Sequence, residues 1–179
     1  MSRLLAAWDE LLQSALDGDF DEQQAAIFQI GLILERHNPA ITGEQDIYDE
    51  ELSRDLQRLM LAKDRLVDTI NKLLNWATTR KAPADACLFA VSHAPASLVL
   101  RPFFAFLVKR GAALDDAAAY VATQIIDDCV RQEPQQVAKM PSLDTVIALL
   151  EDWQDAEDDL LADKALFSSR RLNNLMGQA

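Results

Sequence analysis

Residues 11–35, LLQSALDGDFDEQQAAIFQIGLILE, decide the fold of this chain of 179 residues. The leucine and alanine spacing over residues 11–16 is typical of the end of an amphipathic helix. The Asp-Gly-Asp sequence that follows predicts a tight turn, with a positive φ at Gly18 ending this helix. Asp19 and Asp21 are both suited to cap a second helix.

The second helix is predicted to be buried on more than one face. Residues 25–34 are apolar almost without interruption, and Gln29 is the main exception. A helix that is apolar all round is covered by other elements on several sides. Gly31 lies in its middle, where glycine is less stable than alanine by about 1 kcal/mol. We therefore expect another helix to cross closely at Gly31, and Asn38-Pro39 to end the element.

This helix-turn-helix resembles one unit of a HEAT-type αα-repeat. In that pattern a leucine-rich helix leads through a short Asp-rich turn to a helix with an Ala-Ala pair and a later glycine. The resemblance implies a scaffold for binding, stacked on further helices. The matching parts are Leu11-Leu12, Asp17-Gly18-Asp19, Ala25-Ala26 and Gly31.

Composition predicts an all-α protein with one domain over residues 1–179. Half of the residues are hydrophobic, which suffices for a full core. The 5 glycines and 6 prolines are few for this length, which favours long elements and short connections. We expect an irregular helical bundle, or a stack of αα-hairpins, of about seven to eight helices.

A long central helix is predicted from about residue 46 to residue 80. No glycine or proline falls between Glu44 and Ala82. A helix of about 30 residues would span about 45 Å, and two copies could pair along it to form a homodimer. The residues of its heptad seam are Leu52, Leu56, Leu59, Lys63, Leu66, Ile70, Leu73 and Ala77.

Prolines, glycines and capping residues place the remaining helices. Residues 168–179 are expected to form a short helix or a frayed tail. The other helices are predicted from Ala84 to about His93, from Phe103 after Pro102 to Arg110, from Asp115 through Cys129, and from Ser142 through Asp163, with Phe167 as the furthest end.

The net charge narrows the class of partner, and the cysteines indicate the cellular compartment. The formal net charge is −12, which argues against direct binding to nucleic acid or to an anionic membrane and favours a basic protein partner. Cys87 and Cys129 form no CxxC motif and are typical of reduced thiols in a cytoplasmic protein. Acidic residues near the N-terminus interrupt any signal-peptide core, and no apolar run approaches the ~18 residues of a membrane span.

Nearly all of the excess acidity lies in residues 115–163, which hold 13 acidic and 2 basic residues. Two interpretations are open. The acids form a solvated face that keeps the protein soluble, or a docking surface whose charge speeds association with a basic partner. The docking hypothesis assigns partner binding to Glu151, Asp152, Asp155, Glu157, Asp158, Asp159, Asp127 and Asp128.

A metal site is the alternative use of these acids. Asp155, Asp158 and Asp159 have the i, i+3, i+4 spacing of one helix face, and such carboxylates can hold Mg²⁺ between helices in all-α phosphohydrolases. Asp46 and Asp49 offer a comparable spacing in the N-terminal part of the chain, and no cluster of Lys or Arg that could hold a phosphate adjoins the three aspartates in sequence. We therefore predict no resident metal or cofactor and keep the three aspartates as the alternative metal site.

No catalytic motif stands out. A nucleophile pair of Cys87 and His93 is conceivable, but Cys87 lies in the apolar run ADACLFAV, which is typical of a buried structural thiol. GxSxG, HExxH and Gly-rich phosphate loops are absent from the sequence. The leading hypothesis is a protein-binding module that is not an enzyme, in the form of an acidic immunity protein or inhibitor that occludes a basic toxin or effector. The alternatives are an all-α metal-dependent phosphohydrolase and an adaptor that dimerises through the long helix.

Overall fold

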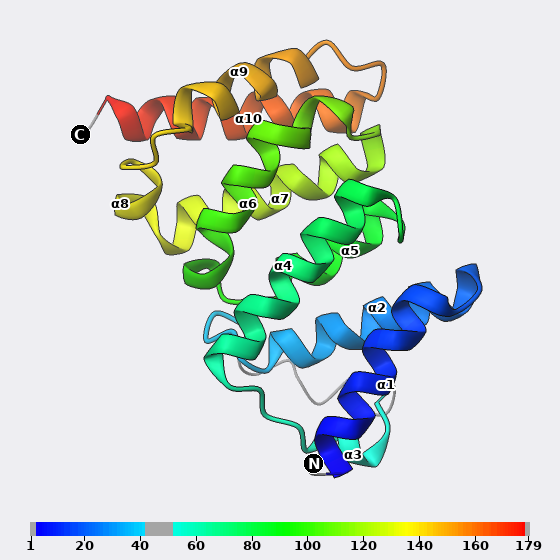
Figure 1. The fold of residues 1–179 in the computed structure, drawn as a ribbon. Coiled ribbons are helices and arrows are strands. Elements are labelled where there is room, and N and C mark those ends of the chain that lie inside the picture. Colours follow the sequence, from blue (N-terminus) through cyan, green and yellow to red (C-terminus); the bar gives the residue numbers. More distant parts are fainter. Residues whose placement is uncertain (1–2, 42–51, 178–179) are drawn as a thin grey trace. The chain divides into compact units, whose positions relative to one another are not determined.

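The computed structural model describes residues 3–41 and 52–177, and within them every regular element is a helix (Figure 1). The predicted all-α class is confirmed. The chain divides into two compact units, unit 1 (Met1–Pro95) and unit 2 (Ala96–Ala179). No helix in the described part of the chain is both long and apolar enough to cross a membrane. In chain order the helices are α1 (Arg3–Asp17), α2 (Phe20–Glu35), α3 (Arg54–Gln57), α4 (Lys63–Thr79), α5 (Ala84–Ser92), α6 (Ala96–Arg110), a 3₁₀ helix (Gly111–Ala113), α7 (Asp116–Gln132), α8 (Pro134–Val137), α9 (Leu143–Trp153) and α10 (Asp159–Met176).

Unit 1 is built around α2, which packs against α1 and α5. Helix α4 packs on α5, and α3 packs on α1 (Figure 1). Asp19 caps α2: its side chain accepts the backbone N–H of Glu22 at 3.0 Å, and the Glu22 carboxylate accepts the backbone N–H of Asp19 at 3.1 Å. This reciprocal pair fixes the turn between α1 and α2 and confirms Asp19 as the cap.

The predicted burial of residues 25–34 is confirmed for most of that segment. Every residue from Ile30 to Leu34 is buried, as are Ala26 and Ile27. Ala25, in the second turn of α2, is exposed. The helix is therefore enclosed in its second half, where α5 crosses it.

The close helix crossing predicted at Gly31 is confirmed. A Cβ atom at Gly31 would lie 3.2 Å from the Cα atom of Ala90 in α5. The positive φ predicted at Gly18 is wrong, because Gly18 does not adopt one. Glycine is required at Gly18 for space: a Cβ there would lie 2.7 Å from both the Cβ of Glu22 and the carbonyl oxygen of Ser14.

The continuous helix predicted over residues 46–80 is wrong within the described residues. Helix α3 ends at Gln57, residues 58–62 are not helical, and α4 begins at Lys63. Residues 46–51 lie outside the described part. The adaptor hypothesis assigns dimerisation to one long helix, and in the described part of this stretch the longest helix is α4, with 17 residues.

Side chains from the end of α2 satisfy the backbone of the interrupting segment. Arg36 Nη1 donates to the carbonyl oxygens of Leu56 and Gln57 at 2.9 and 2.6 Å. The backbone N–H of Leu61 donates to His37 Nε2 at 3.2 Å. These bonds supply partners that a continuous helix would have supplied from within itself. The leucines of this stretch are buried without a common helix: Leu52, Leu56, Leu59 and Leu61.

In unit 2, α10 packs against α7 and α9, and α6 packs against α7 and α9. Helix α6 begins at Ala96, earlier than predicted, and runs through Pro102. Proline lacks the N–H that would bond to the carbonyl of Leu98, but its fixed φ suits a helix. Phe103 and Phe104 are fully buried, and this burial holds the helix together across the proline.

The helix predicted from Ser142 to as far as Phe167 is wrong. Helix α9 ends at Trp153, residues 154–158 are not helical, and a new helix begins at Asp159. The Asp158 side chain ends the connection by accepting the backbone N–H groups of Leu160 and Leu161 at 2.8 and 3.0 Å. An aspartate cap therefore starts α10 where the apolar pattern alone suggests continuity.

The C-terminal segment is helical as far as Met176. Ser168 and Leu172 are fully buried, so the second half of α10 belongs to the core. Of the two expectations for residues 168–179, a helix or a frayed tail, the structure shows a helix as far as Met176. Residues 178–179 lie outside the described part.

Candidate protein-binding surfaces

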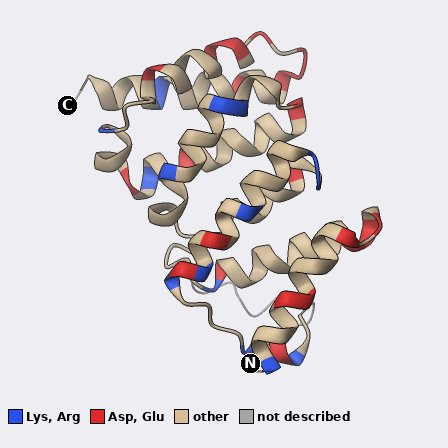
Figure 2. Ribbon diagram, in the orientation of Figure 1, with Lys and Arg blue, Asp and Glu red and all other residues tan. Residues whose placement is uncertain are grey.

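Six predicted binding residues lie together around the connection between α9 and α10 (Figure 2). We call this set the acidic tip. None of its carboxylates forms an ion pair with another described residue, and each of the six residues is exposed. The tip consists of Glu151, Asp152, Asp155, Glu157, Asp158 and Asp159.

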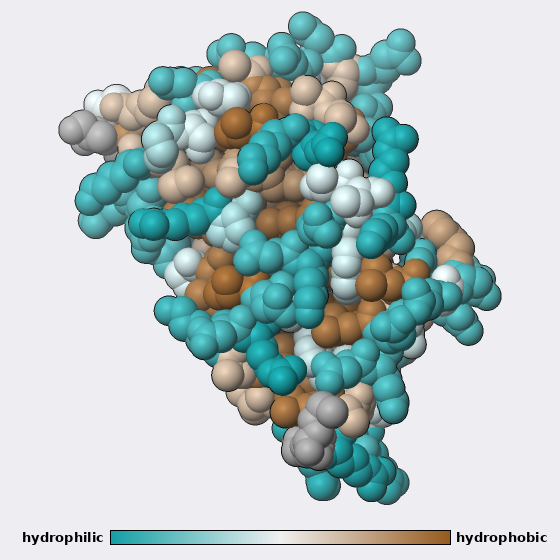
Figure 3. Space-filling view, in the orientation of Figure 1, coloured by the Kyte–Doolittle hydropathy of each residue, from teal (hydrophilic) through white to brown (hydrophobic). Residues whose placement is uncertain are grey.

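An apolar side chain stands beside these charges. On the face seen in Figure 3, apolar residues form small patches separated by hydrophilic side chains. Leu160, next to the tip, has 69% of its surface exposed, the largest fraction among the large apolar residues of the described chain. Trp153, at the end of α9, is buried and anchors the base of the tip. The tip therefore combines a negative field with an apolar contact point.

Asp127 and Asp128 have other partners. Asp127 accepts a hydrogen bond from Ser168 Oγ at 2.9 Å and lies 3.8 Å from Arg171. Burial raises the pKa of Asp127, against the opposing effects of the Ser168 hydrogen bond and of Arg171. Asp128 pairs with Arg131 at 2.6 Å. Asp127 therefore helps to hold α7 against α10, whereas Asp128 forms an ion pair on the surface of α7.

The structure therefore separates the eight predicted residues into two sets. Ser168 follows Asp159 by nine residues in α10, about 13 Å along the helix axis. The partners of Asp127 lie toward the middle of α10, whereas the acidic tip surrounds its start. The sequence could not show this, because it does not reveal which turn of α10 meets α7.

The spacing argument for a metal site is wrong. Asp155 lies in the connection, Asp158 is the cap, and Asp159 is the first residue of α10, so the three do not share a helix face. Within residues 3–41 and 52–177, no group of three or more His, Cys, Asp or Glu side chains is placed to hold a metal ion.

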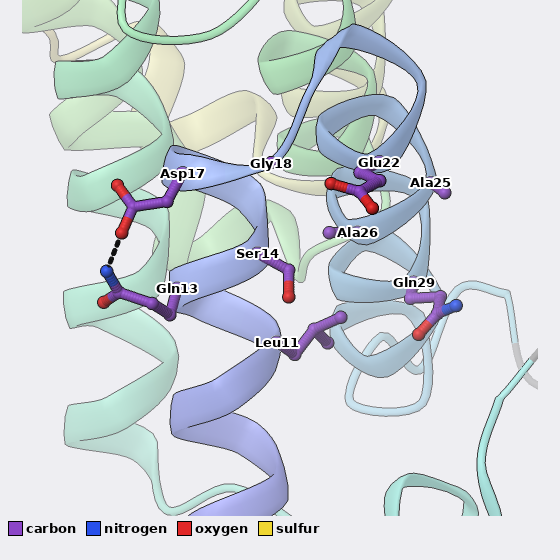
Figure 4. A pocket seen from close by; sticks show the side chains of 9 residues that line it. All are labelled: Leu11, Gln13, Ser14, Asp17, Gly18, Glu22, Ala25, Ala26 and Gln29. Carbon is purple, nitrogen blue, oxygen red and sulfur yellow. Dashed lines mark hydrogen bonds between the residues drawn. The ribbon is translucent and has the colours of Figure 1, made fainter.

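A second surface, which the sequence did not reveal, is a groove of about 490 Å³ between α1 and α2 (Figure 4). Leu11 and Ala26 are buried at its base, and Asp17 and Glu22 add negative charge to its rim. Both carboxylates already accept hydrogen bonds, Asp17 from Gln13 and Glu22 from the backbone of the α2 cap. The small residues that leave this space open are Ser14, Gly18, Ala25 and Ala26.

The end of α2 carries a polar cluster. His93 Nδ1 and Glu35 Oε2 are 2.6 Å apart, and both side chains are largely buried. The Phe89 ring meets the His93 ring edge-on, with centroids 4.8 Å apart. Cys87 is fully buried, and burial raises the pKa of its thiol to about 12, so the thiol is protonated at neutral pH, which argues against a Cys-His nucleophile pair. This cluster ties α2 to α5.

We expect His37 to make the stability of unit 1 depend on pH. Burial, followed by the positive charge of Arg36, lowers the pKa of His37 below 6.5. Its Nε2 must be unprotonated to accept the N–H of Leu61. The unfolded chain therefore takes up a proton near pH 6.5 that the folded chain does not, so stability is complete above that pH and falls as the pH drops through the folded pKa. We expect hydrogen exchange in α2 and α4 to accelerate between pH 7.5 and pH 5.5, after correction for the intrinsic rate.

The matched variant is His37→Gln, which keeps an acceptor at a similar reach but does not titrate. Its pH-dependent acceleration should be smaller than that of the wild type. Equal pH dependence in the two proteins would show that other groups carry the effect.

Comparison with known proteins finds no matching family model, no similar curated protein and no similar solved structure. The chemistry of the surfaces described above therefore carries the functional argument.

Proposed function

We propose that this chain is a protein-binding module whose acidic tip docks a basic protein partner, in the manner of an immunity protein that occludes a toxin or effector. The observation that carries the proposal is the gathering of six exposed carboxylates without ion-pair partners among the described residues, beside the exposed side chain of Leu160. The resemblance of residues 11–35 to a HEAT-type unit is consistent with a binding scaffold.

The two parts of the tip would act at different stages of binding. Long-range attraction between the carboxylates and a cationic surface raises the association rate and orients the encounter. An apolar side chain that enters a pocket of the partner then slows dissociation, since buried anchors hold most of the energy of an interface. Leu160 is placed for this second step.

Reversing charge at the tip tests the proposal. The change is Asp152→Lys, Asp155→Lys and Glu157→Lys, which spares the Asp158 cap and removes no side-chain hydrogen bond between described residues. The partner would be captured from the native host on the immobilised wild-type chain and identified by mass spectrometry. We expect the association rate of the purified pair to fall at least about tenfold at low salt and to lose its dependence on ionic strength.

A control variant with the same change in net charge separates local docking from general repulsion. Glu10→Lys, Asp21→Lys and Asp64→Lys alter exposed residues of unit 1, whereas the tip belongs to unit 2. Equal slowing in both variants would mean that only net charge matters, and an unchanged rate in the tip variant would refute the docking surface.

A further inference from the structure

Unit 2 contains a groove of opposite charge to the acidic tip. It has a volume of about 420 Å³ and lies between α6 and the segment from α8 to the start of α9. Small-molecule pockets span about 300–1,000 Å³, so the groove can hold a small group. Its lining residues are Leu100, Arg101, Gln136, Lys139, Met140 and Pro141.

The two cations of this groove have no ionic partner. Arg101 and Lys139 are exposed, and neither forms an ion pair or side-chain hydrogen bond with another residue of the described chain. The chain has 29 acidic residues against 17 basic ones, so carboxylates to neutralise them are plentiful. Two unpaired cations on the rim of one groove favour an anionic occupant.

The rest of the lining favours an apolar body on that occupant. Leu100 is almost fully buried at the base, and Met140 and Pro141 add apolar surface. An Arg guanidinium binds a carboxylate through two parallel hydrogen bonds, and Lys supplies a second positive charge. The Gln136 amide can both donate and accept, which suits a peptide group. Because Gln136 and both cations are exposed, a longer chain can leave the groove into solvent.

We propose that this groove binds the C-terminal carboxylate of a peptide whose last side chain is apolar. Arg101 and Lys139 hold the carboxylate, the apolar surface around Leu100 receives the side chain, and Gln136 bonds to the last peptide group. This site is independent of the docking at the acidic tip: it selects an anion, whereas the tip selects a cation.

The experiment is a calorimetric titration of the full chain with an acetylated pentapeptide that ends in leucine with a free carboxylate. The same peptide with an amidated end and octanoate are titrated in parallel. We expect the free acid to bind and the amide to bind at least about tenfold more weakly. Failure of the free acid to bind at millimolar concentration, or equal binding of the amide, would overturn the proposal. Octanoate binding as tightly as the peptide would also overturn it, because the groove would then take a free aliphatic acid.

Variants assign the binding to the groove. The double change Arg101→Gln and Lys139→Gln alters two exposed side chains and should weaken binding of the free acid at least about tenfold. The matched control is Lys109→Gln with Arg110→Gln, also exposed and also of unit 2, which should bind as the wild type does. Equal weakening in both would show attraction to net charge and contradict a built site. Circular dichroism of all variants confirms that the fold is kept.

Discussion

Replacing Gly31 with valine is expected to destabilise unit 1 by about 2–3 kcal/mol, in the range of overpacked cores. A Cβ at Gly31 would already lie 3.2 Å from the Cα and 3.5 Å from the Cβ of Ala90. The nearer atom belongs to the α5 backbone, which cannot rotate away as a flexible side chain can. The two methyl groups of valine would extend further, so α5 would have to move away from α2.

Whether Gly31→Val lowers or raises stability distinguishes the effect of packing from that of helix propensity. Glycine is the poorer helix former, so propensity alone would make Gly31→Val stabilising by a few tenths of a kcal/mol. The matched control is Ala25→Val, which places the same side chain on an exposed position of α2 and should cost about 0.5 kcal/mol. Urea unfolding, monitored by hydrogen exchange in α2 and α5, measures the change in the free energy of unfolding for both variants. A Gly31→Val protein as stable as the wild type would show that the crossing is looser than the structure has it.

Apolar pattern predicted burial better than it predicted helix boundaries. The sequence predicts that residues 25–34 form a buried helix and that another helix crosses at Gly31. Both features depend on local composition and sterics, so a local pattern can indicate them. The seam leucines Leu52, Leu56 and Leu59 are buried, as the apolar stripe indicates. Their continuous helix was wrong because Arg36 and His37, far away in the sequence, supply hydrogen-bond partners to that backbone. No local pattern reports such bonds.

The candidate site was predictable in its chemistry but not in its geometry. The charge count located the excess acidity, and the tip indeed carries six of those residues at one end of α10. The break at residues 154–158 contains no glycine or proline, yet Asp158 before a run of apolar residues is a local cap signal that could have indicated it. The separation of Asp127 from the tip depends on which turn of α10 faces α7. The groove between α1 and α2 depends on side-chain sizes across two helices.

Replacing Asn38 with aspartate is expected to destabilise unit 1 by about 2–5 kcal/mol, the loss of two buried hydrogen bonds. Asn38 is 1% exposed, and its Nδ2 donates to the carbonyl oxygens of His93 and Ala94, each at 3.1 Å. Its Oδ1 accepts the backbone N–H of Ala40 at 3.1 Å. A carboxylate has the same shape and keeps the last bond, but it cannot donate and would face two carbonyl oxygens.

The loss should also depend on pH. Burial and the facing carbonyl dipoles disfavour the charged form of the new carboxyl group, so its pKa would be raised in the folded state above the unfolded value of about 3.9. Stability relative to the wild type would then fall as the pH rises from about 4 through that raised pKa, because the unfolded chain releases the proton first. Urea unfolding of both proteins at pH 4.5 and pH 7.5 measures this, with Asn71→Asp on the exposed face of α4 as the control. A penalty equal to that of the control, or one that does not change with pH, would mean that Asn38 does not hold α5 to the end of α2 through its amide.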